Sequence, residues 1–380
     1  MTAATAVRPD PTTGVSTVDI VGCGVFSAAG RGLAPLAEAF ALPPAGVPEP
    51  TAEPGWPALP TRPLPGFDPA ALLGRKGLSR LTRTDQLVLA AVADALEDVG
   101  DGTRPAESDS VGPGPAESGI VTGTALGSPN AVLAFLRDTF EQASPYLVNP
   151  SHFPGTLMNS AAGKAAIRHG LTGLNATVSG GAMASLNALR YARTALLEGR
   201  ARRLFTGGTE ELSSTGAWAW HRGRALAAGT ALAEGCAVFT LDAGSSARVL
   251  GRIHTVTTGF ADPVDGLGGV SARLAATVRE ALTTAGLTPD DVTLVVPGSS
   301  GRRGWAAVEE RGLREVFGAG PRLRTHRVLG ETHSAGVALN LATVLAGWRY
   351  PWQTTGLGRV AVLTSAGFDG SVGCLVVTHP

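Results

Sequence analysis

The order of predicted strands and helices constrains the fold of this chain more than any other feature of its sequence. Apolar, strand-like runs such as 119–124 and 175–179 are each followed by a helical pattern, and the second half of the chain continues in the same style. Strands that alternate with helices predict an α/β fold with mainly parallel, helix-covered sheets. A chain of 380 residues is too long for one core, so we expect a loose tail over 1–15 and two fused halves, 16–243 and 244–380.

Composition excludes several classes of function. Lys+Arg and Asp+Glu both total 31, so the basic excess typical of a nucleic-acid-binding protein is missing. Cys23, Cys236 and Cys374 are far apart and lack metal-ligand spacing, and we expect them to be buried as small apolar residues. The glycines of 22–30 fail the spacing of a dinucleotide-binding loop, so no cofactor is expected. No apolar run has the length of a membrane span and no signal-like pattern opens the chain, which predicts a cytoplasmic protein.

One segment has the pattern of a nucleophile elbow. A predicted strand over 175–179 runs into two glycines and then directly into a helix. Such a turn places the first helical residue at the positive end of the helix dipole, where acyl-transfer enzymes have a cysteine or serine. Here that residue is Ala182, and a methyl group cannot carry an acyl chain. Ser179 and Ser185 flank the elbow, but we expect them to pack in the turn and the helix.

The segment 175–189 is similar to the nucleophile elbow of the β-ketoacyl synthases, the condensing enzymes of fatty acid and polyketide synthesis. Further motifs resemble that family, in the family's order, across almost the whole chain. They are Phe67–Leu73, Asn159–Gly173, Gly207–Leu212, Thr332–Gly336 and Ser365–Gly370. The resemblance implies a thiolase-like fold, in which two pseudo-symmetric halves form a layered αβαβα core.

The resemblance also carries the family's catalytic positions over to this sequence. Family members hold the acyl chain on a cysteine and use two histidines for decarboxylation and for stabilising the enolate. The cysteine falls on Ala182, the first histidine on Pro297 and the second on His333, and a lysine of the family falls near Val328. We therefore predict no catalytic set, with His333 retained either as a hydrogen-bonded buried side chain or as a base. Phe368 matches the phenylalanine that guards the cysteine, or it is ordinary packing.

A condensing-enzyme fold without its cysteine resembles the chain-length factor, or ketosynthase β subunit, of type II polyketide synthases. That subunit pairs with an active ketosynthase α subunit and shapes the tunnel that holds the partner's growing chain. Members that make aromatic polyketides commonly have glutamine where Ala182 stands, so this chain is closer to a reducing, polyene-type system. Two alternatives stay open: a stand-alone acyltransferase, hydrolase or cyclase with His333 as base, and a non-catalytic homodimeric scaffold.

The same resemblance implies surfaces for two partners. Ketosynthases pair around the elbow, here about 159–178. The acidic acyl carrier protein would dock on a basic group, although charges there also serve solubility. This group consists of Arg75, Lys76, Arg80 and Arg83.

The resemblance to chain-length factors also implies a tunnel gate facing the partner, on a helix that follows the turn at 123–128. The gate residues would be Pro129, Val132 and Leu136, whose spacing puts them on one helical face. Because none of them carries a bulky ring, the tunnel would admit a slim, linear chain. The alternative is that these residues are ordinary core or interface packing.

Overall fold

The structure is a computed structural model, which describes residues 16–44, 46–100, 114–243, 248–351 and 357–380. The tail expected over 1–15 lies outside these residues. The expected boundary between the two halves adjoins 244–247, which also lie outside them, so that division stays a prediction.

The described strands form one mixed sheet that falls into two groups. Its order is β10-β11-β12-β9-β1-β8-β6-β4-β5, with β2 beside β1, and the groups meet where β1 pairs with β9 over Val18–Ile20. The strands of this sheet are β1 (Val18–Ser27), β2 (Gly30–Arg31), β4 (Ser118–Thr124), β5 (Asn175–Ser179), β6 (Arg203–Glu210), β8 (Gly235–Asp242), β9 (Gly251–Phe260), β10 (Leu294–Pro297), β11 (Val360–Ala366) and β12 (Ser371–Thr378). A separate pair consists of β3 (Thr61–Arg62) and β7 (Leu232–Ala233).

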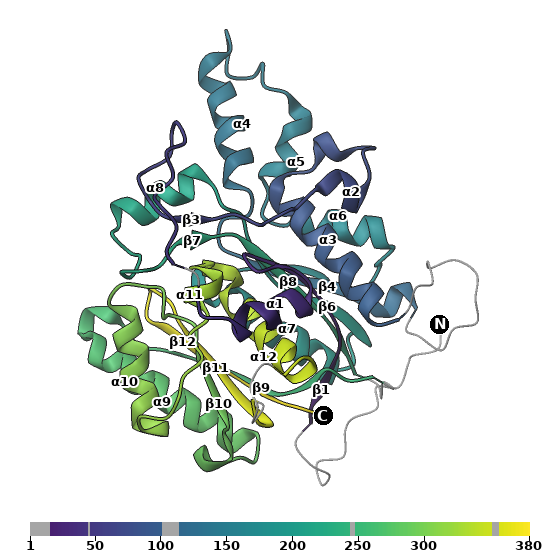
Figure 1. Ribbon diagram of the computed structural model, residues 1–380. Helices are drawn as coiled ribbons and strands as arrows, with labels where there is room; N and C mark the ends of the chain where they lie inside the picture. The colour runs from purple at the N-terminus through teal and green to yellow at the C-terminus, as the bar shows by residue number, and fades with distance from the viewer. Residues whose placement is uncertain (1–15, 45, 101–113, 244–247, 352–356) are drawn as a thin grey trace.

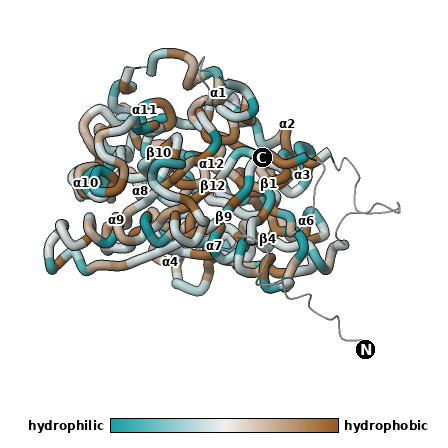
Figure 2. Tube along the Cα trace, turned by 90° about the horizontal axis from the view of Figure 1, so that it is seen from below, coloured by the Kyte–Doolittle hydropathy of each residue, from teal (hydrophilic) through white to brown (hydrophobic). Residues whose placement is uncertain are grey.

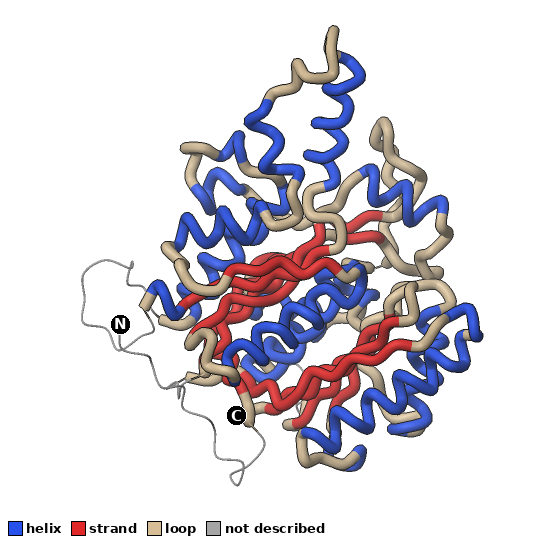
Figure 3. The backbone as a smooth tube through the Cα atoms, turned by 180° about the vertical axis from the view of Figure 1, so that it is seen from behind, coloured by secondary structure: helices blue, strands red, loops and turns tan. Residues whose placement is uncertain are grey.

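Helices lie on both outer faces of the sheet and between its two groups of strands (Figures 1 and 3). α3 and α6 cover one outer face, α7 and α12 lie between the groups, and α9 and α10 cover the other outer face. This order confirms the predicted αβαβα core. The helices are α1 (Leu33–Ala41), α2 (Pro69–Leu73), α3 (Arg83–Asp98), α4 (Pro129–Glu141), α5 (Phe153–Thr156), α6 (Ser160–His169), α7 (Ala184–Leu197), α8 (Ser214–Arg222), α9 (Leu267–Thr284), α10 (Trp305–Phe317), α11 (His326–Leu329) and α12 (Gly336–Arg349).

The expectation of mainly parallel sheets is wrong. β4 is parallel to β5 and β6, and β10 to β11, but β1–β8, β6–β8, β9–β12 and β11–β12 are antiparallel. The reason is clearest at β11 and β12, which are joined by residues 367–370 alone. So short a connection permits only an antiparallel pair, whereas a parallel pair needs a crossover of a dozen residues or more.

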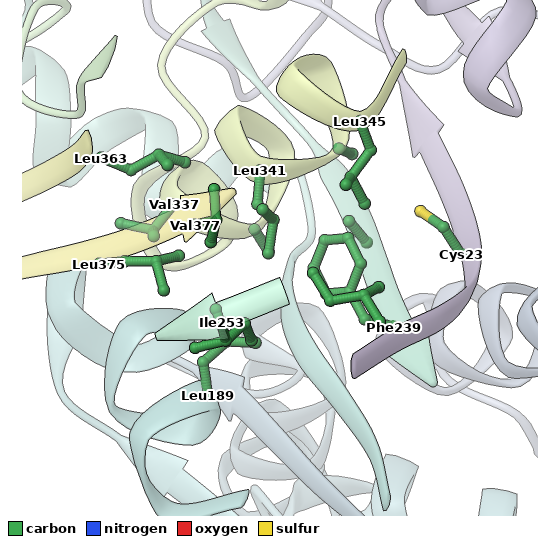
Figure 4. Close-up of a cluster of buried hydrophobic side chains, with 14 of the residues drawn as sticks. Cys23, Leu189, Phe239, Ile253, Val337, Leu341, Leu345, Leu363, Leu375 and Val377 are labelled. Carbon is green, nitrogen blue, oxygen red and sulfur yellow. The ribbon is translucent and has the colours of Figure 1, made fainter. Parts of the chain in front are cut away.

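Helix α12 is buried on all sides because it lies between the two groups of strands. All its residues from Val337 to Gly347 are buried. A helix that is apolar all round is expected in the middle of a layered core. Figure 4 shows its side chains together with those of β11, β12, β9, β8 and α7, namely Val337, Leu341, Leu345, Leu363, Leu375, Val377, Ile253, Phe239 and Leu189. Each such side chain contributes about 1.5–3 kcal/mol by leaving water.

The outer helices have one apolar face. α10 carries both brown and teal segments in Figure 2, and accordingly Val308 and Leu313 are buried while Arg311 and Arg314 are exposed. Helix α3 begins at a capping box in which Thr82 and Asp85 exchange side chain–backbone hydrogen bonds. Local signals of this kind determine where a helix begins.

Candidate functional site

The elbow forms where β5 turns into α7. Gly180 is extended, and Gly181 has a φ of 52°, a left-handed conformation that glycine adopts at little cost. Ala182 lies in a single 3₁₀ turn (Gly181–Met183) that leads directly into α7. Its side chain is 2% exposed, and its carbonyl accepts a hydrogen bond from the Ser365 hydroxyl at 3.2 Å. The predicted elbow is therefore present, with a buried methyl group at its tip.

His333 lies beside this elbow. A Cβ built on Gly181 would be 3.7 Å from His333 Nε2, so the ring faces the turn. His333 has a φ of 44°, a strained value for a residue with a side chain, and its N–H donates to Glu331 Oε1 at 2.9 Å. Burial, together with the nearby Arg302 guanidinium, lowers the pKa of His333 from 6.5 to about 4. The ring is therefore neutral near pH 7, and a base with so low a pKa is a weak proton acceptor there.

Pro297 is buried at the end of β10, and the loop that follows it is held by a buried carboxylate. Glu309 accepts the N–H groups of Gly298 at 3.1 Å and Ser299 at 2.6 Å. Burial raises the pKa of Glu309, against the hydrogen bonds that favour its charged form. A proline side chain has no acid–base group, so this position offers neither a proton donor nor an acceptor.

An ion pair in the interior holds the same loop from the other side. Arg302 is 1% exposed, donates to the carbonyls of Gly298 (2.8 Å) and Ala366 (2.5 Å), and pairs with Glu331 at 3.4 Å. Glu331 in turn accepts the backbone N–H of His333. Arg302 thus ties the loop after Pro297 to the backbone of His333. This role of Arg302 was not predicted, because two adjacent arginines in a Gly-rich loop are expected to be exposed.

Two tryptophan rings pack around His333 and Phe368. Trp220 of α8 contacts His333 edge-on with ring centroids 5.5 Å apart, and it contacts Phe368 at 5.8 Å. Trp305 contacts Phe368 from the other side at 5.7 Å. Phe368 itself is 42% exposed, so it stands at the rim of the site. Neither Trp220 nor Trp305 was predicted, because they reach this site from segments that are distant from each other and from His333 in the sequence.

A cavity of about 280 Å³ lies against this ring cluster. Glu210 lines it, and its carboxylate is hydrogen-bonded by the Ser334 hydroxyl and lies 3.8 Å from His333 Nδ1. Burial raises the pKa of Glu210 to about 7. The cavity wall comprises Leu126, Glu210, Glu211, Ser213, Gly216, Ala219, Trp220, Ala225, Leu232, Ala233, Glu331, His333 and Phe368.

Neither serine near the elbow is directed at His333. The Ser179 hydroxyl donates to the carbonyl of Ala125 at 3.3 Å. Ser185 is fully buried, and its Oγ accepts the N–H of Ala338 at 3.3 Å, between α7 and α12. The three cysteines are buried, as expected, and burial raises the pKa of each of these thiols.

Known proteins resemble this chain in sequence and in structure. The family model "Beta-ketoacyl synthase, N-terminal domain" matches residues 65–247. The chain is 31% identical to a chain in the structure of the ishigamide ketosynthase/chain length factor, with a TM-score of 0.81 and coverage of 96% of this chain and 99% of that one. The chain belongs to the β-ketoacyl synthase family. The resemblance found in the sequence is thereby confirmed.

Two curated relatives extend this assignment. The tetracenomycin polyketide synthase ketoacyl synthase beta subunit of Streptomyces glaucescens is 28% identical over 316 residues, which cover 73% of this chain and 72% of that protein. A PKS-NRPS hybrid synthetase of Aspergillus candidus is 31% identical over 225 residues, or 52% of this chain. This ketosynthase-family chain covers only 9% of the length of that synthetase.

The three residues predicted to form a tunnel gate lie on α4. Pro129 is buried, Val132 is half-buried and Leu136 is 49% exposed. α4 extends away from the body of the molecule in Figure 1, so its outer part contributes little to the core. Other large apolar side chains are exposed on α4 and on the chain that follows it: Leu133, Phe140, Tyr146, Leu147, Phe153, Leu157 and Met158.

The four basic residues singled out for carrier-protein docking have different environments. Arg75, Lys76 and Arg80 are exposed around the short turn between α2 and α3. Arg83 is half-buried, pairs with the buried carboxylate of Glu234 at 2.6 Å and stacks over an aromatic ring. Arg83 therefore has a role in packing, and the docking role of all four residues stays a prediction.

Two further kinds of site, metal sites and membrane-spanning helices, are absent from the part of the chain that the structure describes. Within that part, no three His, Cys, Asp or Glu side chains gather in a way that could hold a metal ion. None of its helices is both long and apolar enough to cross a membrane.

Proposed function

We propose that this chain is the chain-length-factor subunit of a type II polyketide synthase. The observation that carries the proposal is Ala182, a buried methyl group at the elbow of an otherwise complete ketosynthase-family fold. Pro297 replaces the first histidine, and His333 has a pKa of about 4, so neither supports condensation near neutral pH. The solved ketosynthase/chain length factor that is 31% identical supports the same role.

The partner would be an active ketosynthase α subunit. β5 is the outermost strand of its group, and an unpaired strand edge is a template for pairing with another chain. α6 contacts β5, and α5 links α6 to α4, so the exposed apolar residues of α4 continue the surface that begins at this edge. Large exposed apolar surfaces of this kind mark protein interfaces.

In the heterodimer, the gate residues would line a tunnel for the partner's acyl chain. Val132 and Leu136 lie one helical turn apart on α4 and are not enclosed by this chain's own core. The exposed group Arg75, Lys76 and Arg80 would contact the acidic acyl carrier protein. Ala182 in place of the glutamine common among aromatic-polyketide members supports a reducing, polyene-type system.

The site geometry does not favour a stand-alone acyltransferase, hydrolase or cyclase. Such an enzyme needs a nucleophile within hydrogen-bond reach of its base. Ser179 and Ser185 both bond elsewhere, and His333 would be a weak base.

The proposal is tested by co-expressing the chain with a ketosynthase of the same organism that has an intact Cys-His-His set. We expect the two to co-purify as a 1:1 complex and to make a defined polyketide with a carrier protein. Val132→Trp and Leu136→Trp should shorten the product while the complex stays intact. Ala134→Trp, on another face of α4, is the matched control and should not shorten it. A stable monomer that does not bind the ketosynthase would contradict the proposal. Gate variants that leave the length of the product unchanged would also contradict it.

A further inference from the structure

The 280 Å³ cavity beside His333 is outside the tunnel gate but adjoins it. Leu126 lines the cavity, is 47% exposed and is three residues before Pro129, the first gate residue. Glu211, another wall residue, accepts the backbone N–H of Asn130 at 3.1 Å and so caps the start of α4. The cavity and the gate helix are therefore parts of one connected structure.

The cavity wall offers no positive charge to a ligand. Among the wall residues, none is an arginine or lysine, and His333 is neutral near pH 7 because its pKa is about 4. A carboxylate, a phosphate or a phosphopantetheine arm would find no countercharge here. The occupant must be uncharged at the end that enters.

The carboxyl groups of the wall are already engaged by the protein. Glu331 pairs with Arg302, Glu210 is bonded by Ser334, and Glu211 is bonded by Thr84 Oγ1 at 2.9 Å. Burial also raises the pKa of Glu210 and Glu211, which reduces their negative charge. The rest of the wall is mainly apolar, so the cavity fits a hydrocarbon better than a cation.

Trp220 has the largest side chain in the wall of this space. Its ring packs edge-on against His333 and Phe368, which line the same cavity. Trp218, two residues earlier on α8, points elsewhere: its indole N–H donates to the carbonyl of Gly55 at 2.9 Å. A small side chain at 220 would enlarge the cavity beside His333 and Phe368.

We propose that this cavity receives the uncharged, distal end of a linear acyl chain that enters past Leu126, and that Trp220 is the wall that limits its length. The inference rests on the proposed function, because the chain in question is the one grown by the partner. Trp220 is then a specificity-determining residue in addition to the gate on α4. The inner limit of the tunnel lies where an active member of the family would do its chemistry.

The first test uses the purified complex and a ten-carbon primary alcohol that carries an alkyl diazirine, with the matching carboxylic acid for comparison. After photolysis, peptide mass spectrometry should find the alcohol attached within 213–226 or at Phe368. The acid should label these peptides at least several-fold less. Equal labelling by the two probes, or no labelling of these peptides by the alcohol, would overturn the proposal.

The second test measures product length in the reconstituted pair. Trp220→Ala should lengthen the product by at least one two-carbon unit, and Trp218→Ala, the matched control on the same helix, should leave it unchanged. If the gate variants shorten the product but Trp220→Ala leaves it unchanged, the present inference fails and the proposed function stands. If the chain pairs with no ketosynthase, the proposed function itself fails, and the tunnel role of the cavity with it.

Discussion

Replacing Ala182 by cysteine should restore a thiol at the elbow without restoring its reactivity. Residue 182 is 2% exposed, and burial at two other sites in this protein raises the pKa of the Cys236 and Cys374 thiols, that of Cys236 to about 12. At pH 7.5, about one-tenth of a free thiol with a pKa of about 8.5 is ionised to the thiolate. The ionised fraction of a thiol with a pKa of about 12 is about 3,000-fold smaller. The start of α7 would offset about one pKa unit of this effect.

We therefore expect Ala182→Cys to react with iodoacetamide at pH 7.5 about 10²- to 10³-fold more slowly than a free thiol. Intact-mass spectrometry follows the reaction, and Ser79→Cys, at an exposed position, serves as the fast control. Condensation should stay at background, because Pro297 supplies no imidazole. Alkylation of Ala182→Cys as fast as that of Ser79→Cys, or measurable condensation by the variant, would refute this reasoning.

Two further predictions concern the residues that surround the elbow. Because the pKa of His333 falls from 6.5 to about 4 on folding, its neutral form stabilises the protein above pH 6.5 and this contribution is lost as the pH drops toward 4. His333→Gln should flatten the pH dependence of the urea midpoint over that range, and an unchanged slope would contradict the pKa. Arg302→Met leaves Glu331 buried without its partner and should lower the free energy of unfolding by about 3–5 kcal/mol. Adding Glu331→Gln, which removes the charge but still accepts the N–H of His333, should restore part of it. A double variant less stable than Arg302→Met alone would show that the ion pair is not the cause.

The parts of the structure that follow from local signals could be predicted from the sequence. The elbow is one, because a strand, two glycines and a helix are adjacent in the chain, and β5 has the predicted bounds. β9 and α8 were missed. β9 mixes polar and apolar residues and is fixed by pairing with β1 and β12, which are distant in sequence.

The site could be predicted only where a family motif marked it. Ala182, Pro297, His333 and Phe368 each lie in such a motif, and the structure brings them to one region. Trp220 and Arg302 take part only because folding brings α8 and the loop after β10 to His333, and no local pattern reports such contacts. Arg83 differs in environment from its exposed sequence neighbours, because the carboxylate of Glu234, distant in the sequence, binds it.

The most direct test of the central claim is to locate the acyl group in the working complex. The complex is incubated with acyl-loaded carrier protein, and each subunit is then analysed by peptide mass spectrometry. We predict an acyl adduct on the active-site cysteine of the ketosynthase partner. We predict no adduct on residues 177–188 of this chain, with or without the partner. An acyl adduct within 177–188, or condensation by this chain alone, would contradict the central claim.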